Sequence, residues 1–446
     1  MLEAIWKDVR YLVIDEISMV SPALLSQISH RICETKAWDP IASAKPFGGV
    51  NVIFAGDFGQ LPPVKTYAMF SHELVQHLKP SLAESIEGQS SLHGAYLWRQ
   101  VNQVVKLRKN FRASSDPRFI NLLNRVRSGI AWNGLTKKTP NQEGTGIDFN
   151  ISDYDVLYNR RLDVLTAQDS EALTRFKNAP VVVADKLLRD KLNIKMVTSF
   201  AKESKQELYM YHSRDRYKRA PMEGIQQYYA WQINSSITKD SMGKLPLVPG
   251  MRVMITENAA LSAKIVNGTE GILQDIKFET DNNGNRYAIC AYVHVPGCRL
   301  RLPGLAYEIV PILPVQSHFL YHEAQKKRKN DKRSNTSVLG ACYSISRTQL
   351  PLLPAYAFTN YKIQGRSLSA TIVDLQRCSS LQSVYVMLSR AKSLNGIAIL
   401  RHFYPKQIYR SMSQQFRDEF LRLDVLDQKT KEEYDRRFEN TDVDMV

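Results

Sequence analysis

The chain has 446 residues, 43% of them hydrophobic and 23% charged, which predicts two or three lobes that each have a core. Its 60 Lys and Arg against 44 Asp and Glu give a formal charge of +16, so we expect a polyanionic partner, with nucleic acid ahead of an anionic membrane. The five cysteines form no CxxC pair, which argues against a disulfide framework or a zinc site and suits a reducing compartment. No apolar run approaches the ~20 residues of a membrane span, so we expect a soluble protein without a membrane partner.

Short apolar runs rich in branched residues recur along the chain, each followed by a turn and a helical stretch. They are residues 11–14, 50–55, 181–184 and 370–375. This alternation is typical of a parallel sheet with crossover helices, and it predicts an α/β fold.

The pattern changes between Pro246 and Leu302. Strand-like residues 272–279 and 287–295 flank the turn sequence Asp281–Asn285, which predicts a hairpin within a small antiparallel β module inserted into the second lobe. Residues 136–179 and 323–336 are predicted loops. The tail from Gln407 is a predicted charged helix whose apolar face consists of Phe416, Phe420, Leu421 and Leu423.

The first apolar strand ends on two carboxylates, Asp15 and Glu16. In open α/β sheets, ligands bind beyond the carboxyl ends of the strands, so we expect both acids to face a crevice. Asp15 could then hold a Mg²⁺ ion that bridges nucleotide phosphates, and Glu16 could polarise the attacking water. An ordinary turn is the alternative interpretation.

The second strand ends on Gly56-Asp57-Phe58-Gly59-Gln60, followed by Leu61-Pro62-Pro63-Val64. Gly56 and Gly59 would let the backbone approach a ligand closely, and the Gln60 amide could sense a γ-phosphate or position water. A tight connection is the alternative for this loop alone, but two such strand ends together indicate a nucleotide site.

These segments resemble those of a known family. Residues 11–19 resemble the Walker B segment, and residues 56–64 the sensor motif, of Pif-type DNA helicases in superfamily 1, relatives of the RecD-like enzymes. Four later segments match further motifs of that family in order: Leu107–Arg112 with Phe119–Gly129, Leu245–Gly271, Tyr356–Gly365 and Tyr385–Arg390.

The resemblance implies two RecA-like P-loop NTPase lobes with an inserted antiparallel, SH3-like β module. The first lobe, residues 1–106, would be incomplete, and the second would span residues 107–446. Within the second lobe we expect a loop or insert at 136–179, the β module at 245–345, the fifth and sixth motifs at 355–405 and a helical tail at 406–446.

The resemblance also implies roles for single residues. Arg112 and Arg390 would be arginine fingers that neutralise charge on the γ-phosphoryl group, where a surface or salt-bridge arginine is the alternative. The implied catalytic residues are Asp15, Glu16, Gln60, Arg112 and Arg390. The implied contacts to ATP are Gly56, Asp57, Gln60, Gly365 and Arg390, with Mg²⁺ on Asp15. The implied contacts to DNA are Asn267, Thr359, Lys362 and Gln364. Tyr361, where the family commonly has His, has no assigned role.

Two basic segments leave their interpretation open. The stretch Tyr209–Trp231 interleaves Tyr, Trp, Lys and Arg, which is typical either of a surface on which single-stranded DNA stacks or of amphipathic packing. The run Lys326–Arg333 is a nuclear address, a DNA contact or a solvated loop.

No Gly-x-x-x-x-Gly-Lys sequence followed by Ser or Thr occurs, since Leu follows the only Gly-Lys pair, Gly243-Lys244. In the family, this phosphate-binding loop precedes the Walker B strand. We therefore expect a truncated chain that is inactive alone, with a chain that evolved without catalysis as the alternative.

The expected function is that of an ATP-dependent 5′–3′ DNA helicase in DNA repair, recombination, telomere and genome maintenance, or a mobile element. The expected partners are ATP, single-stranded DNA and junctions of single- and double-stranded DNA. We expect a monomer in the nucleus, with mitochondria as the alternative. A non-catalytic single-stranded DNA-binding remnant is the second functional hypothesis, and an RNA helicase the third.

Overall fold

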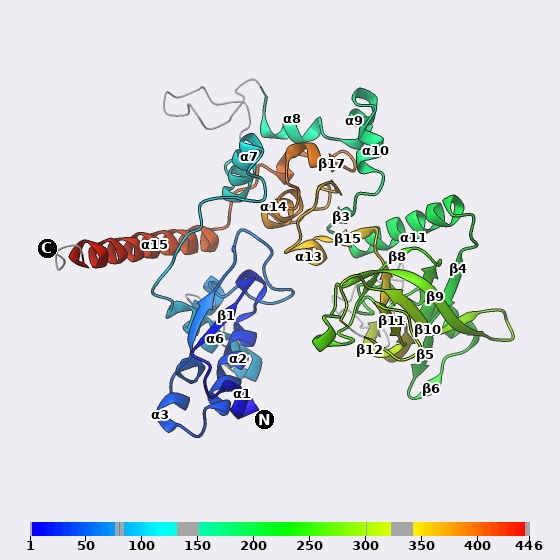
Figure 1. Cartoon of the computed structure of the whole chain (residues 1–446), viewed down its shortest axis with the longest axis horizontal. Coiled ribbons are helices and arrows are strands. Elements are labelled where there is room, and N and C mark those ends of the chain that lie inside the picture. Colours follow the sequence, from blue (N-terminus) through cyan, green and yellow to red (C-terminus); the bar gives the residue numbers. More distant parts are fainter. Residues whose placement is uncertain are drawn as a thin grey trace, which may run out of the picture. The chain divides into compact units, whose positions relative to one another are not determined.

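The computed structural model describes residues 2–75, 80, 84–131, 151–299, 301–322 and 342–441, and it divides into two compact units (Figure 1). Unit 1 consists of Met1–Phe176 and Ile363–Val446, and unit 2 of Lys177–Lys362. The fold is mixed α/β, as predicted. The lobe boundary expected between residues 106 and 107 stays a prediction.

In unit 1, the first two predicted strands are confirmed. Strands β1 (Tyr11–Ile14) and β2 (Asn51–Phe54) pair in parallel, with Ile14 opposite Phe54. The crossover contains α2 (Pro22–Thr35), which begins after Ser21, whose side chain accepts a hydrogen bond from the Leu24 amide.

Helix α2 packs on α6 (Ile86–Arg99). A Cβ atom at Gly94 of α6 would lie 1.8 Å from the Pro22 carbonyl oxygen, so only glycine permits this approach. The smaller helical elements of this region are α1 (Leu2–Trp6), η1 (Ile17–Met19), α3 (Pro40–Ser43), η2 (Pro46–Gly49) and α4 (His72–Val75).

The rest of unit 1 contains a second parallel pair, β16 (Thr371–Val373) and β17 (Ile397–Ile399). The helical elements of this part are α7 (Pro117–Ser128), α8 (Asp153–Tyr158), α9 (Leu162–Gln168), α10 (Ala172–Phe176), α14 (Leu381–Leu388), η5 (Leu394–Gly396), η6 (Pro405–Gln407) and α15 (Gln414–Thr441).

The expected loop at 136–179 is wrong for its second half, which forms α8, α9 and α10; residues 136–150 lie outside the described residues. Ser152 caps α8 by accepting a hydrogen bond from the Asp155 amide. Each of these helices buries an apolar side chain: Leu157, Leu165 and Phe176. The stretch was predicted to be a loop because most of its residues are polar, but one apolar side is enough for a short helix to pack.

The predicted tail helix is present as α15, but it begins at Gln414 rather than at Gln407, residues 442–446 lie outside the described residues, and its apolar face needs a correction. Phe416 is buried, and Phe420 and Leu423 pack against the core of unit 1, but the side chain of Leu421 is 66% exposed. At 3.6 residues per turn, positions 416, 420 and 423 share one face of the helix and position 421 is turned away from it.

Unit 2 begins with β3 (Val181–Val183), which pairs in parallel with β15 (Ala357–Thr359), and with α11 (Lys186–Glu203). One antiparallel-rich sheet has the order β14-β8-β9-β10-β4-β7, with β11 on β10. Its strands are β4 (Tyr209–His212), β7 (Lys244–Leu247), β8 (Arg252–Ile255), β9 (Glu270–Thr280), β10 (Arg286–His294), β11 (Ile309–Ile312) and β14 (Leu352–Pro354). The hairpin predicted around Asp281 is confirmed as β9 and β10.

A second sheet of unit 2 has the order β12-β13-β5-β6. Its strands are β12 (Val315–His322), β13 (Cys342–Gln349), β5 (Arg214–Tyr217) and β6 (Ala220–Pro221). Unit 2 also contains α12 (Gly224–Trp231), which follows β6, and the 3-10 helix η4 (Leu261–Ala263), which lies between β8 and β9. Helix α13 (Asn360–Ile363) follows β15.

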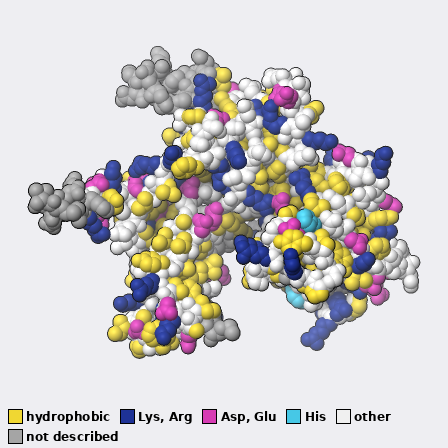
Figure 2. Space-filling model, viewed as in Figure 1, with side chains coloured by type: hydrophobic (Ala, Val, Ile, Leu, Met, Phe, Trp, Pro, Cys, Tyr) yellow, Lys and Arg dark blue, Asp and Glu magenta, His cyan; other side chains and the backbone are white. Residues whose placement is uncertain are grey.

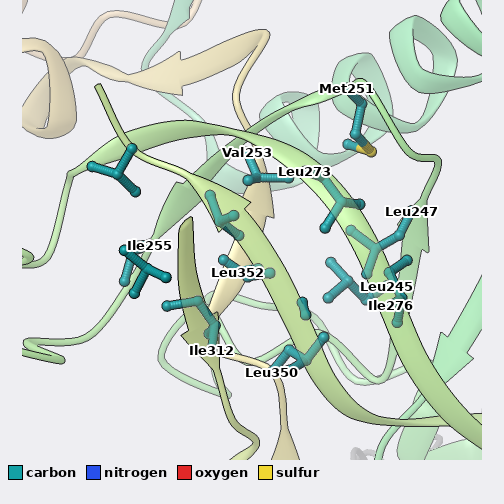
Figure 3. Packing of buried hydrophobic residues seen from close by; sticks show 14 of the residues in the cluster. Leu245, Leu247, Met251, Val253, Ile255, Leu273, Ile276, Ile312, Leu350 and Leu352 are labelled. Atoms are coloured by element: carbon teal, nitrogen blue, oxygen red, sulfur yellow. The ribbon is translucent and has the colours of Figure 1, made fainter. Parts of the chain in front are cut away.

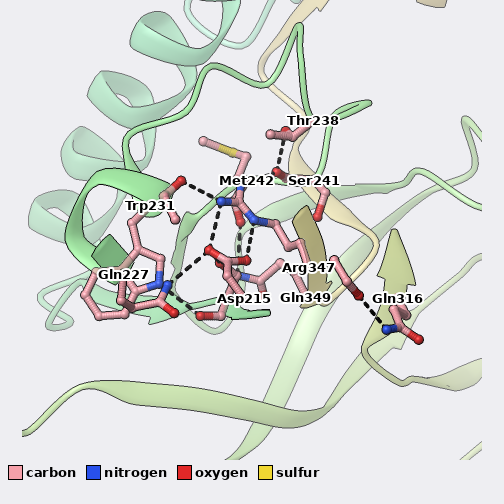
Figure 4. A network of polar contacts seen from close by, with 12 residues as sticks. Asp215, Gln227, Trp231, Thr238, Ser241, Met242, Gln316, Arg347 and Gln349 are labelled. Atoms are coloured by element: carbon pink, nitrogen blue, oxygen red, sulfur yellow. Dashed lines mark hydrogen bonds and ion pairs between the residues drawn. The ribbon is translucent and has the colours of Figure 1, made fainter. Parts of the chain in front are cut away.

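Two different interiors hold unit 2 together. Aliphatic side chains of β7, β8 and β9 fill an apolar core, in which Leu245, Val253 and Leu273 are fully buried (Figure 3). Beside it lies a buried polar network in which Arg347 forms two hydrogen bonds with Asp215, of 2.8 and 3.0 Å (Figure 4). Both side chains are 0% exposed, so the ion pair joins β5 to β13 without contact with water.

Within the described residues, no helix combines the length and apolar character needed to cross a membrane. The same part of the chain contains no group of three or more His, Cys, Asp and Glu side chains that could hold a metal ion by themselves.

Candidate functional site

The carboxyl ends of β1 and β2 lie side by side. The Ala55 amide donates to the Ile14 carbonyl at 2.8 Å, and the Ile17 amide donates to the Ala55 carbonyl at 3.0 Å. Gly56 has φ 147°, and a Cβ atom there would lie 2.9 Å from the Ile17 nitrogen. Glycine at position 56 is therefore what lets the two loops meet, and this brings the acidic pair next to the sensor loop as predicted.

Glu16, directly after Asp15, adopts a left-handed backbone conformation, with φ 52° and ψ 43°. The Glu16 amide donates to Asp15 Oδ1 at 2.7 Å. Glu16 Oε2 accepts a hydrogen bond of 2.7 Å from Gln364 Nε2, although the two residues are far apart in sequence. A Cβ atom on Gly365 would lie 3.7 Å from Glu16 Oε1, so Gly365 also borders this carboxylate.

Three buried oxygen atoms around these loops have no hydrogen-bond partner within the described residues: Ser18 Oγ, Gln60 Oε1 and Gln364 Oε1. Buried polar atoms are nearly always paired, so an orphaned group indicates water, an ion or a ligand. Together with the exposed carboxylate of Asp15, these oxygens are the hard donors that Mg²⁺ prefers. The residues present therefore fit a hydrated Mg²⁺ ion.

Arg112 and Arg390, far apart in sequence, lie close together. Arg112 donates to Ser367 Oγ at 2.7 Å and to the Ser389 carbonyl at 3.1 Å. Arg390 is 2% exposed and donates to the Val386 carbonyl at 3.0 Å and to Ser389 Oγ at 2.9 Å.

Within the described residues, Arg390 forms no ion pair with a carboxylate. Burial, followed by the positive charge of Arg112, lowers the pKa of Arg390 to about 10. It still carries its charge at neutral pH, because that value lies well above 7. Two neighbouring guanidinium groups, one of them buried without a carboxylate, form a site suited to a bound anion.

Asp57 of the sensor loop has a partner that the sequence did not assign. Arg127 forms hydrogen bonds with both carboxylate oxygens of Asp57, the shortest being 2.7 Å, and its guanidinium lies 4.8 Å from the ring centre of Phe420. Burial opposes the charge of Arg127, but the hydrogen bond and charge of Asp57 outweigh it and raise the pKa of Arg127. The motif segment Phe119–Gly129 contained Arg127, but only tertiary contact identifies its partner.

Tyr385 lies next to this ion pair. Burial and then the negative charge of Asp57 raise the pKa of Tyr385 to about 12, so its hydroxyl remains protonated and can donate a hydrogen bond. Asp57 is thus fixed by Arg127 rather than aimed at a ligand, and its predicted contact to ATP stays a prediction.

The predicted DNA contacts are separated into two groups. In unit 2, the Lys362 ammonium donates to Asn267 Oδ1, and Asn267 is exposed, so these two residues form one polar surface feature. Thr359 is 5% exposed at the end of β15. Gln364 belongs to unit 1, where it contacts Glu16, so the structure associates it with the acidic pair.

The two basic segments have different outcomes. In Tyr209–Trp231, Tyr211 is a core residue at 3% exposure, whereas Tyr228 and Tyr229 are 54% and 67% exposed, so the stretch contains both packing and surface aromatics. The run Lys326–Arg333 lies outside the described residues. Lys and Arg side chains are spread over the surfaces of both units (Figure 2).

Comparisons with known proteins agree with the resemblance to Pif-type helicases. Residues 1–134 match the family model described as PIF1-like helicase. The chain is 28% identical over 401 residues to the ATP-dependent DNA helicase PIF1 of Mus musculus, a match that covers 89% of this chain and 46% of the relative. It is 25% identical over 454 residues to the ATP-dependent DNA helicase RRM3 of Saccharomyces cerevisiae, covering 95% of this chain and 55% of that relative. The chain thus spans about half the length of these relatives.

Solved structures share the fold. The Pif1 helicase from Bacteroides in complex with ADP-AlF3 and ssDNA superposes with a TM-score of 0.59 at 23% identity, covering 94% of this chain and 76% of that one. The Pif1 helicase from Candida albicans gives a TM-score of 0.51 at 22% identity, with coverages of 94% and 78%.

Proposed function

We propose that this chain, which is similar to PIF1-like helicases in sequence and fold, forms the greater part of the motor of an ATP-dependent DNA helicase. The observation that carries the proposal is the combination of the Glu16–Gln364 contact with the neighbouring Arg112 and Arg390. Acid, amide and arginines are among the groups that hydrolysis of a nucleoside triphosphate uses.

In this proposal, Glu16 accepts a proton from the attacking water, while the unpartnered oxygens of Gln60 and Gln364 orient that water. Asp15 would hold Mg²⁺, which supplies neutralisation of phosphate charge. Arg390 and Arg112 stabilise the negative charge that develops on the transferred group, and burial strengthens the effect of Arg390 because there is little water to screen it.

The Glu16–Gln364 hydrogen bond offers a route from the nucleotide to the DNA. Gln364 lies two residues after Lys362, which contacts Asn267 on the surface of unit 2. A change in the charge or hydration of Glu16 during hydrolysis would alter the hydrogen bond to Gln364 and so act on the segment that carries Lys362. We propose that single-stranded DNA is the ligand of Lys362 and Asn267 and that the protein moves along it from 5′ to 3′. We further propose that the protein acts as a monomer in the maintenance of nuclear or mitochondrial DNA.

The test uses this chain joined to a P-loop segment of a relative. With single-stranded DNA and Mg-ATP, the joined protein should hydrolyse ATP, and Arg112→Ala or Arg390→Ala should lower kcat by roughly 10³-fold or more while leaving DNA affinity unchanged. Arg118→Ala, an exposed arginine in the same part of unit 1, is the matched control and should keep full activity. Loss of DNA affinity with normal hydrolysis would reverse the assignment of the two arginines.

A non-catalytic DNA-binding function is the second candidate. It is favoured by the formal charge of +16, which supports strand binding independently of hydrolysis. The joined protein separates the candidates, because a binding remnant would show strand affinity and no DNA-stimulated hydrolysis.

A further inference from the structure

A row of aromatic rings and cations crosses unit 2. In spatial order it consists of Tyr229, Tyr228, Lys244, Trp231, His212, Tyr287 and Arg214, and we call it the aromatic row. The ring centres of Tyr228 and Tyr229 are 5.9 Å apart, and those of His212 and Trp231 are 4.3 Å apart. The Lys244 ammonium lies between its neighbours, 5.3 Å from the Tyr228 ring centre and 5.5 Å from that of Trp231.

The strands and a glycine build the centre of the row. His212 of β4 is directly opposite Lys244 of β7. A Cβ atom on Gly243 would lie 2.5 Å from the Cα atom of Trp231, so glycine lets the end of α12 pack on this strand pair. The Trp231 indole then donates to the Ser213 carbonyl at 2.9 Å.

The buried polar network fixes α12, which carries the exposed end of the row. Gln227 donates to Asp215 Oδ2 at 3.0 Å, and Arg347 donates to the Ala230 carbonyl at 2.6 Å (Figure 4). One side of the helix is thereby anchored to the ion pair between β5 and β13. Its other side leaves the adjacent rings of Tyr228 and Tyr229 accessible, at 54% and 67% exposure.

The charges of the row fit a polyanion. Lys244 has no carboxylate partner within the described residues, whereas Arg214 at the far end is paired with Glu279. At the centre of the row, His212 Nδ1 is buried and has no hydrogen-bond partner among the described residues. Rings that present a π-face next to an uncompensated cation are the elements with which proteins bind unpaired bases and their phosphates.

We propose that the aromatic row is a stacking surface for the bases of single-stranded nucleic acid, with Lys244 contacting a phosphate. The inference rests on the proposed DNA-binding function and extends it, because the row shares no residue with the Lys362–Asn267 pair. Within Tyr209–Trp231, the proposal assigns strand binding to the row members His212, Arg214, Tyr228, Tyr229 and Trp231, while Tyr211 is part of the core.

The test measures binding of fluorescently labelled oligo-dT to the 446-residue chain by anisotropy. Replacing both Tyr228 and Tyr229 by Ala should weaken binding by at least roughly 5-fold, and by about 150-fold if one base loses a stacking energy of ~3 kcal/mol. Replacing both by Phe should retain the affinity, because the rings remain. Tyr307→Ala, with 59% exposure in the same unit, is the matched control and should leave affinity unchanged.

A second readout concerns the cation. Lys244→Gln should lower the slope of log affinity against log salt by about one, and Lys277→Gln, at an exposed lysine of unit 2, should not alter it. An oligo-U strand of equal length shows whether DNA and RNA share the surface.

Each outcome decides a different question. If the unmodified chain binds no strand even at low salt, the proposed function fails and the inference fails with it. If the chain binds but the double Ala variant binds equally well, only the aromatic row is ruled out, and a protein partner becomes the better explanation of the exposed rings. Equal weakening by the Ala and Phe pairs would also overturn stacking, because it would assign the effect to the hydroxyl groups.

Discussion

Arg347 and Arg390 are both buried but stand in opposite electrostatic surroundings. Arg347 is 0% exposed and bonds to both oxygens of Asp215, while Arg390 is 2% exposed with Ser389 and a backbone carbonyl as partners. A buried cation without a counter-ion costs stability, so its retention in the fold points to an anion that binds there. The same cost of burying an unpaired charge lowers the pKa of Arg390, because burial disfavours its protonated form.

We predict opposite effects of the same substitution at these two sites. Arg347→Met should lower the free energy of unfolding of unit 2 by about 3–5 kcal/mol, because Asp215 is left buried and unpaired. Arg390→Met should leave the stability of unit 1 unchanged or raise it, because it removes an uncompensated charge. Denaturation in urea followed by circular dichroism checks both, and a large loss of stability in Arg390→Met would show that this arginine is structural.

At the scale of elements, α15 supports a segment that has no regular structure. Residues 101–110 form neither helix nor strand, and their polar groups bond to side chains of α15. The Val104 amide donates to Thr430 Oγ1 at 3.0 Å, and the Lys106 amide donates to Asp427 Oδ1 at 2.7 Å. The helix thereby fixes the segment that leads to Arg112, and a role for the tail in positioning that arginine follows from these contacts.

Removal of one carboxylate should loosen this segment. We predict that Asp427→Ala increases amide hydrogen exchange at residues 104–108 by about tenfold, because the Lys106 amide and Arg108 both lose their partner. Asp424→Ala is the control: its side chain is 60% exposed and pairs with the Lys106 ammonium rather than with a backbone amide of the segment, so exchange should stay unchanged. If exchange at residues 104–108 in Asp427→Ala equals that of the unmodified chain, α15 does not restrain the segment.

For the whole molecule, the excess of positive charge has consequences that do not depend on any single contact. Lys and Arg side chains lie on both units, so phosphate binding is expected to be distributed (Figure 2). Binding of this kind releases counter-ions and depends strongly on salt, whereas stacking on exposed rings favours unpaired bases over a duplex.

We predict that the 446-residue chain binds single-stranded DNA with an affinity that falls by orders of magnitude between ~50 and ~200 mM salt. A duplex of the same length should bind more weakly, because its bases are already stacked. A titration of labelled strands at several salt concentrations checks both statements. Absence of binding at low salt would contradict the prediction, and equal affinity for duplex would remove stacking from the account.

ATP hydrolysis by the 446-residue chain can also be predicted. The chain contains no Gly-x-x-x-x-Gly-Lys sequence followed by Ser or Thr, so we expect no DNA-stimulated hydrolysis even though Glu16, Arg112 and Arg390 are in place. Positioning of the phosphates dominates phosphoryl transfer, and acids and arginines alone do not provide it. Phosphate release in the presence of DNA measures this, with Glu16→Gln as the control for contaminating activity. Hydrolysis that Glu16→Gln abolishes would contradict the prediction.

The sequence by itself indicated several of the strands and the residues that follow them. Alternating apolar runs and turn residues are local patterns, so β1, β2, the β9–β10 hairpin and α15 could be predicted, and the carboxyl-end rule placed Asp15 and Glu16 beside the loop of Gln60. The helices at residues 153–176 were not predicted, because short helices with few apolar residues have a weak periodic pattern.

Tertiary structure alone decided the partners. Asp57 with Arg127, Glu16 with Gln364, Asp215 with Arg347 and Lys244 between two rings join residues from separate elements. Periodicity gives the side of an element on which a residue lies, but contacts between elements depend on how their faces pack, and no local pattern encodes that. The division of Tyr209–Trp231 into core and surface rings arises for the same reason: Gly243 and the buried ion pair fix the orientation of α12, and that orientation determines which rings meet water.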